Sequence, residues 1–276
     1  MLAAAIIVFR EVLEAALIVG IVMAATRGLR ARGLWAAVGI GGGVLGAGLV
    51  ALFGVAIANA AAGMGQDLLN ASILFAAVAM LGWHNIWMNK HGRELASDAA
   101  RLGREVRSGD RPLYAVASAI GLAVLREGSE VVLFLYSLAA SDSAGAVSVV
   151  GGSVVGIAGG AAVGLLLYFG LLRIPMRHLF TVTSWLILLL AAGMASQAAG
   201  FLVQADLLPE LSPMLWDTSS LLADDSLLGR VLHTLIGYVS RPAGIQVVFY
   251  VATVAVIAVL MRSVGGGSST RRTAHV

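Results

Sequence analysis

The chain contains no cysteine among its 276 residues, and only 12% of its residues are charged, where an average soluble domain has about 25%. The lack of cysteine excludes disulfides, thiolate metal sites and iron–sulfur clusters, so a metal ion would need oxygen, imidazole or thioether ligands. The shortage of charge excludes an ordinary soluble enzyme. Apolar residues make up 59% of the chain and the mean hydropathy is +0.92. Lipid must therefore surround most of the molecule.

Seven apolar segments are long enough to cross a bilayer, which takes about 20 helical residues for about 30 Å of hydrocarbon. They are residues 2–25, 35–59, 68–88, 114–139, 146–171, 179–202 and 243–261. The first is not a secretory signal, because it lacks a basic start and carries Arg10 and Glu11 within its apolar run. The sequence thus predicts an all-α integral membrane protein with seven transmembrane helices.

The basic residues indicate the orientation of these spans. With the N-terminus outside, 14 of the 18 Lys and Arg fall in inner loops or the tail, and two fall in outer loops. This asymmetry follows the positive-inside rule and predicts an N-out/C-in arrangement. The basic pI of about 9.7 is then explained by topology, and a nucleic-acid partner is not expected.

Two copies of one charged motif lie near the centres of the first and fourth spans. Arg10-Glu11-Val12-Leu13-Glu14 and Arg126-Glu127-Gly128-Ser129-Glu130 share the pattern R-E-x-x-E at a displacement of 116 residues. Because these spans run in opposite directions, a three-helix unit must be repeated upside down, as in many secondary transporters. We place repeat one at about 1–90 and repeat two at about 113–202, with the seventh helix outside both repeats.

Glycines in the middle helix of each repeat support this division. Gly152, Gly156, Gly160 and Gly164 recur every fourth residue in the fifth span, and the second span holds the pairs Gly39 with Gly43 and Gly42 with Gly46. Such ridges of small residues let helices approach closely in lipid.

The two motifs predict a cation site. Within each motif the two Glu share a helix face, and the Arg lies four residues before the second Glu. If the helices face each other, four carboxylates and two guanidiniums leave a net charge of −2, which protons or a multivalent cation must neutralise. Helix-borne Glu pairs build iron and manganese sites. A proton relay and a purely structural Arg–Glu clamp remain alternatives at this stage.

The paired motifs in a seven-span, N-out chain resemble those of the oxidase-dependent iron transporter family, which includes the fungal high-affinity iron permeases and the bacterial inner-membrane iron permeases. The resemblance covers residues 1–262. The family pattern is R-E-G-x-E, so the second motif matches fully, while Val12 replaces Gly in the first. The segments Leu215-Trp216-Asp217-Thr218-Ser219 and Gly237-Tyr238 through Arg241-Pro242 also resemble the outer segment of bacterial members.

The resemblance implies an iron permease, not an enzyme, with iron as its transported substrate and no permanently bound cofactor. Glu11, Glu14, Glu127 and Glu130 would be the metal-handling carboxylates, supported by Arg10 and Arg126. An extracytoplasmic oxidase or iron-binding protein would be its partner. Transport of another divalent cation such as lead or manganese, transport of a proton-coupled solute, and an intramembrane enzyme are the alternatives.

Further polar residues are candidates for the ion pathway. His84 and Asn85 lie near the inner end of the third span, and Gln197 lies in the matching helix of repeat two. Asp217, Asp224 and Asp225 belong to the outer segment 203–242, where they either collect cations at the entrance or cap a helix. In that segment Asp225 or Ser226 is expected to cap a short amphipathic helix.

Two remaining segments complete the organisation. Residues 89–113 are predicted to form a charged cytoplasmic helix against lipid headgroups. The last span, 243–261, ends a single transmembrane domain of residues 1–262, and the Gly- and Ser-rich tail 263–276 is predicted to be disordered.

Overall fold

The computed structural model describes residues 1–61, 66–140, 145–170, 176–224 and 226–265. Over these residues the chain is all-helical, without strands. Its helices are α1 (Leu2–Ala25), α2 (Arg32–Ala61), α3 (Gln66–Ser108), α4 (Tyr114–Ala140), α5 (Ala146–Tyr168), α6 (Met176–Gln204), α7 (Leu227–Ile236) and α8 (Gly244–Gly265). The predicted tail lies largely outside the described residues.

Each predicted span coincides with a helix to within a few residues at most ends. The exception is α3, which continues without a break from the apolar span into the charged segment and ends at Ser108. Five helices meet a simple criterion of length and apolar composition for crossing a membrane, namely α2, α3, α5, α6 and α8. The other two long helices, α1 and α4, each carry one Arg and two Glu.

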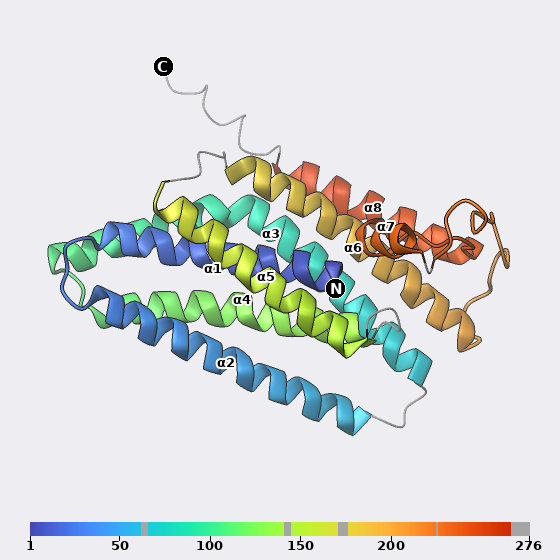
Figure 1. Ribbon diagram of the computed structural model, residues 1–276, viewed down its shortest axis with the longest axis horizontal. Helices are drawn as coiled ribbons and strands as arrows, with labels where there is room; N and C mark the ends of the chain where they lie inside the picture. Colours follow the sequence, from blue (N-terminus) through green and yellow to red (C-terminus); the bar gives the residue numbers. More distant parts are fainter. Residues whose placement is uncertain (62–65, 141–144, 171–175, 225, 266–276) are drawn as a thin grey trace, which may run out of the picture. The chain divides into compact units, whose positions relative to one another are not determined.

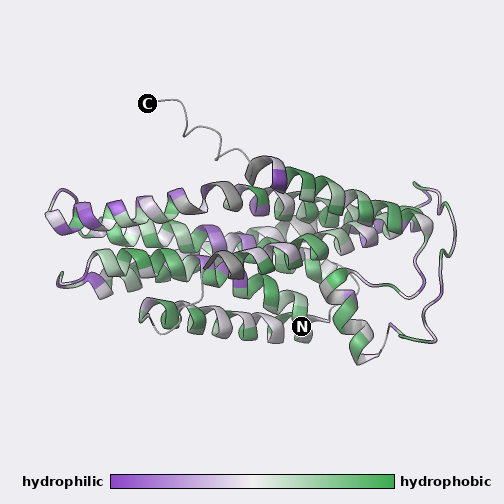
Figure 2. Ribbon diagram, turned by 90° about the horizontal axis from the view of Figure 1, so that it is seen from above, coloured by the Kyte–Doolittle hydropathy of each residue, from purple (hydrophilic) through white to green (hydrophobic). Residues whose placement is uncertain are grey.

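Large apolar side chains cover much of the surface of these helices. Leu45, Leu52, Trp83 and Val147 have exposed fractions of 73%, 68%, 72% and 87%. Figure 2 shows hydrophobic ribbon along most of the helices, with hydrophilic residues gathered in short stretches. An apolar surface of this extent is stable in lipid and not in water.

The chain divides into two compact units. Unit 1 comprises residues 1–62 and 93–179, and unit 2 comprises residues 63–92 and 180–276, so α3 passes from one to the other. Within unit 1, α1 packs against α5, α2 packs against α4, and α1 also contacts α4; Figure 1 shows these four helices side by side. A core cluster of unit 1 gathers Val22 of α1, Ala36 of α2, Ala99 and Val106 of α3, and Val116 and Ile120 of α4.

The glycine ridge predicted in α5 faces α1. A Cβ added at Gly156 would lie 2.7 Å from the Ala5 carbonyl oxygen and 2.8 Å from the Val8 Cβ. One added at Gly160 would lie 2.8 Å from the Phe9 carbonyl oxygen. Only hydrogen fits in these positions, so the ridge sets how closely α1 and α5 approach.

The pair α2–α4 repeats these contacts. A Cβ at Gly43 would lie 2.7 Å from both the Gly121 carbonyl oxygen and the Val124 Cβ. Gly121 and Val124 are displaced by 116 residues from Ala5 and Val8, the same displacement as that of the two charged motifs. The packing thus has the same periodicity as the sequence repeat: α1, the first helix of repeat one, packs on α5, and α4, the first helix of repeat two, packs on α2.

The prediction that Gly42 belongs to the glycine ridge of the second span is wrong. Gly39, Gly43 and Gly46 all contact α4, whereas a Cβ at Gly42 would meet nothing within 4 Å. Gly42 follows Gly39 by three residues, and the helical rotation between them turns it away from the interface with α4.

In unit 2, α7 confirms the predicted capped helix. Ser226 is its N-cap, and the Ser226 hydroxyl accepts a hydrogen bond from the Gly229 amide at 2.9 Å. The helix ends at Gly237, whose φ of +68° is in the left-handed region, where a side chain would be strained. Its Cα also packs directly on Gly193 of α6.

Candidate functional site

The first motif, on α1, is almost completely buried. The side chains of Arg10, Glu11 and Glu14 are 2%, 0% and 2% exposed. Arg10 Nε lies 3.0 Å from Glu14 Oε1, and Arg10 Nη1 lies 3.5 Å from Glu11 Oε1. The spacing of four residues brings Arg10 over Glu14 on one helix face, so a single guanidinium serves both carboxylates.

The second motif, on α4, is more open. Arg126 is 34% exposed and Glu130 is 17% exposed, while Glu127 is 3% exposed. Arg126 Nε lies 3.4 Å from Glu130 Oε1 and 3.8 Å from Glu127 Oε1. The two copies have the same charged residues but different surroundings. The first is buried, whereas the second has longer ion pairs and a partly exposed guanidinium.

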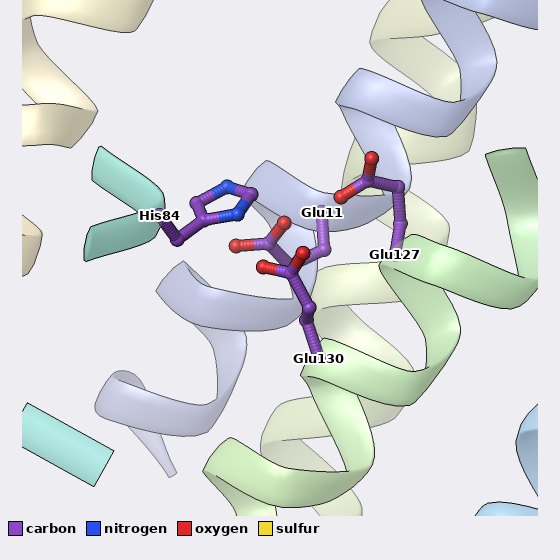
Figure 3. A group of neighbouring side chains, drawn as sticks. All are labelled: Glu11, His84, Glu127 and Glu130. Carbon is purple, nitrogen blue, oxygen red and sulfur yellow. The ribbon is translucent and has the colours of Figure 1, made fainter. Parts of the chain in front are cut away.

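Carboxylates from both motifs converge within unit 1. One oxygen from each of Glu11, Glu127 and Glu130 lies within 4.8 Å of the others, and Figure 3 shows the three side chains turned toward one another from α1 and α4. Glu14 is not in this group, since its ion pair with Arg10 holds it beside the site. The structure therefore brings together three of the four predicted Glu.

This arrangement is electrostatically suited to a cation. Two Arg are present for four Glu in the motifs, and like charges this close repel strongly where water is excluded. A bound proton or a metal ion removes the repulsion. The oxygen donors suit hard cations.

The packing also accounts for Val12, the departure from the family pattern. Val12 on α1 faces Gly160 of α5, where a Cβ would lie 3.0 Å from the Val12 Cβ. At the equivalent position of the second motif, Gly128 faces Ala47 of α2, and a Cβ there would lie 2.8 Å from the Ala47 Cβ. In the second motif the glycine belongs to the motif itself, at Gly128, whereas in the first it belongs to the partner helix, at Gly160. Each helix pair therefore still has one glycine at this contact and approaches closely.

The other pathway candidates lie in unit 2. His84 and Asn85 on α3 are 4% and 1% exposed. The Asn85 amide donates a hydrogen bond to the Ser184 carbonyl oxygen at 3.0 Å, which fixes α3 to α6. Buried polar groups at membrane depth are costly and usually functional.

Gln197 has a partner that the sequence did not reveal. Its Nε2 lies 2.9 Å from Nε2 of His233 on α7, and Nδ1 of His233 lies 2.7 Å from the Tyr238 carbonyl oxygen. A carbonyl oxygen can only accept, so the proton of His233 is on Nδ1 and its Nε2 accepts from Gln197. The signal in the sequence was a histidine in the short amphipathic helix of this segment.

Asp217 and Asp224 fix the backbone of the segment between α6 and α8. Asp217 accepts from the Ser219 amide and hydroxyl and from Arg241 Nε at 2.9 Å. These hydrogen bonds with Ser219, together with that from Arg241, lower the pKa of Asp217 to about 2. Asp224 accepts from the amide and the hydroxyl of Ser240. Asp225 lies outside the described residues.

The fold and the site together define a multi-pass helical membrane protein with a carboxylate cluster suited to cations. Comparison with known families is consistent with this class: residues 1–268 match the Iron permease FTR1 family, and the chain belongs to that family.

Named relatives extend over nearly the whole chain. The ferrous iron permease EfeU of Escherichia coli O6:K15:H31 is 31% identical over 278 residues, covering 96% of this chain and 98% of the relative. Proteins of the same name from Shigella sonnei and Yersinia pestis are 32% and 30% identical, covering 86% and 89% of this chain and 87% of each relative. No solved structure matches the chain.

Proposed function

We propose that the protein imports iron ions across the cytoplasmic membrane through the cluster formed by Glu11, Glu127 and Glu130. The observation that carries this proposal is the convergence of three carboxylate oxygens within 4.8 Å, from two helices that repeat one motif. Glu14 and Arg10 form the adjoining ion pair, which holds Glu11 in place and limits its repulsion from the other carboxylates.

The substrate is an iron ion, and the protein acts by transport, not by catalysis. Membership of an iron permease family supports this choice, and the relatives named as ferrous iron permeases favour the ferrous ion. Oxygen ligands without a thiolate bind ferrous iron only moderately, which suits an ion that must be released. The proposal needs no resident cofactor. An extracytoplasmic oxidase or iron-binding protein would present the ion.

The proposed topology has seven spans, with the N-terminus outside and the C-terminus inside. Five spans meet the apolar criterion. We add α1 and α4, whose 24 and 27 residues are about 36 and 40 Å long and whose charges are concentrated in the two motifs. The inverted repeat then places both motifs near the midplane of the membrane.

His84, Asn85 and Gln197, all in unit 2, are proposed as further residues that contact the ion during transport. His84 is almost fully buried in a helix that meets the criterion for a membrane span. A buried imidazole there can serve as a transient ligand. His84→Ala should slow uptake several-fold without abolishing it.

Uptake of radiolabelled iron by proteoliposomes tests the proposal. Glu130→Ala and Glu14→Ala should each reduce uptake at least tenfold while the protein still inserts and elutes as a single species. Glu94→Ala, at an exposed position on α3, is the matched control and should transport normally. Uptake at the unmutated level by both site variants would refute the site. Stronger competition by lead or manganese than by unlabelled iron would refute the choice of substrate.

A further inference from the structure

Unit 1 contains a cavity that the transport site alone does not explain. It has a volume of about 380 Å³ and lies among α1, the charged part of α3 and the first half of α4. On α4 it follows Ala119, Ala123, Arg126 and Glu127, which share one helix face and extend over about 12 Å. Its lining thus runs from near the start of α4 to the second charged motif.

One end of the cavity reaches the transport site. Glu127 lines the cavity and is also one of the three converging carboxylates. Arg126 lines it too, which explains why this guanidinium is 34% exposed while Arg10 is 2% exposed. Arg126 is thus a partly exposed member of the second motif that lines the cavity, whereas Glu130, which is 17% exposed, does not line it.

The other end lies at the turn between α3 and α4. There Glu105 Oε2 lies 2.7 Å from Arg111 Nε. Arg101 and Asp98, whose Nη2 and Oδ1 atoms lie 3.2 Å apart, are about two to three helical turns before the end of α3, along the side of the cavity. All four residues line the cavity, and Asp98, Arg101 and Arg111 are more than half exposed. Exposed ion pairs of this kind are weak and exchange readily with water, so they form a hydrated rim.

Small and apolar side chains form the walls between these ends, among them Ile18, Leu102 and Ala123. Such walls offer a moving ion no ligand to hold it. An ion would pass from one set of carboxylates to the next with its hydration shell, as conduction requires weak intermediate binding.

We propose that this cavity is the cytoplasm-facing exit vestibule, through which the hydrated cation leaves Glu127 for the rim of Asp98 and Glu105. The inference rests on the proposed function and topology. It adds a defined route on one side of the membrane and gives the charged end of α3 a role in transport besides any contact with lipid.

The absence of cysteine from the chain provides a direct test. Ala123→Cys places a single thiol on the wall of the cavity. Val44→Cys is the control, because Val44 is 58% exposed on apolar α2 and does not line the cavity. A membrane-impermeant, cationic methanethiosulfonate reagent is added to inside-out and to right-side-out vesicles, since it reacts with the thiolate that forms only in water.

Ala123→Cys should react at least tenfold faster from the cytoplasmic side than from the outside, and at least tenfold faster than Val44→Cys. Modification should then lower iron uptake at least fivefold. Equal reaction rates for the two thiols, reaction mainly from outside, or unchanged uptake after modification would each overturn the vestibule. If Ala123→Cys inserts poorly, Ala119→Cys on the same face of α4 replaces it.

The iron site and the exit vestibule can be refuted independently of each other. Labelling depends on access by water and not on iron, so a cytoplasmic labelling pattern can persist even if the Glu variants show that iron is not transported. Conversely, Glu130→Ala could abolish uptake while the Ala123→Cys thiol proves inaccessible to the reagent. That result would support the iron site and refute the exit vestibule.

Discussion

The two Arg–Glu motifs carry identical charges in different surroundings, and this difference decides what each residue contributes. Arg10 is buried with both of its carboxylates, whereas Arg126 adjoins a cavity. Breaking a buried ion pair by removing one partner costs about 3–5 kcal/mol, because the remaining charge has no compensation. A partly exposed partner can be replaced by water at lower cost.

Arg10→Gln should therefore destabilise the protein by about 3 kcal/mol or more, and Arg126→Gln by about 1 kcal/mol. Thermal unfolding in detergent, monitored by size-exclusion chromatography, measures both. The larger loss for Arg10→Gln is the expected result. Equal losses would show that the two motifs have the same environment, against the structure.

Asp217 offers a pH test at the residue scale. Its folded pKa of about 2 lies below the ordinary aspartate value of 3.8, so the contribution of its hydrogen bonds to stability is fully present above pH 3.8 and is lost as the pH falls to about 2. At neutral pH, Asp217→Asn should remove the charged bond to Arg241 and speed hydrogen exchange of the Ser219 amide. Unchanged exchange in this variant would show that the carboxylate does not hold the turn.

At the scale of the elements, glycines set the positions of the motif-bearing helices. Gly156→Leu should separate α1 from α5 and cost about 1–3 kcal/mol, because the added side chain meets the backbone of α1. Gly41→Leu is the matched control, since a Cβ at Gly41 meets nothing within 4 Å. Thermal unfolding of both variants checks this, and comparable losses would contradict the ridge.

Much of the arrangement of the helices could be predicted from the sequence, because lipid enforces long apolar segments and close packing requires small residues in register. The composition of the site was harder to predict from the sequence than the arrangement of the helices. Sequence spacing places Glu11 and Glu14 on one face equally well, and only the rotation of α1 against α5 and α4 decides that Glu11 converges with Glu127 and Glu130. The exposure of Arg126, whose side chain lines a cavity, is likewise not encoded in R-E-x-x-E spacing.

At the scale of the whole molecule, the proposed topology predicts opposite sides for two exposed serines. Ser220→Cys, in the outer segment, should be labelled by an impermeant thiol reagent from outside. Ser97→Cys, in the charged part of α3, should be labelled only from the cytoplasmic side. Labelling of both from the same side would contradict the N-out/C-in arrangement.

The central claim is that iron binds among carboxylates from α1 and α4, and an anomalous-scattering map at the iron absorption edge tests it most directly. Crystals soaked in ferrous iron under reducing conditions should show a peak bounded by Glu11, Glu127 and Glu130, and the peak should vanish in Glu130→Ala. Iron found only at the outer acids Asp217 and Asp224, or a peak that persists in Glu130→Ala, would contradict the account.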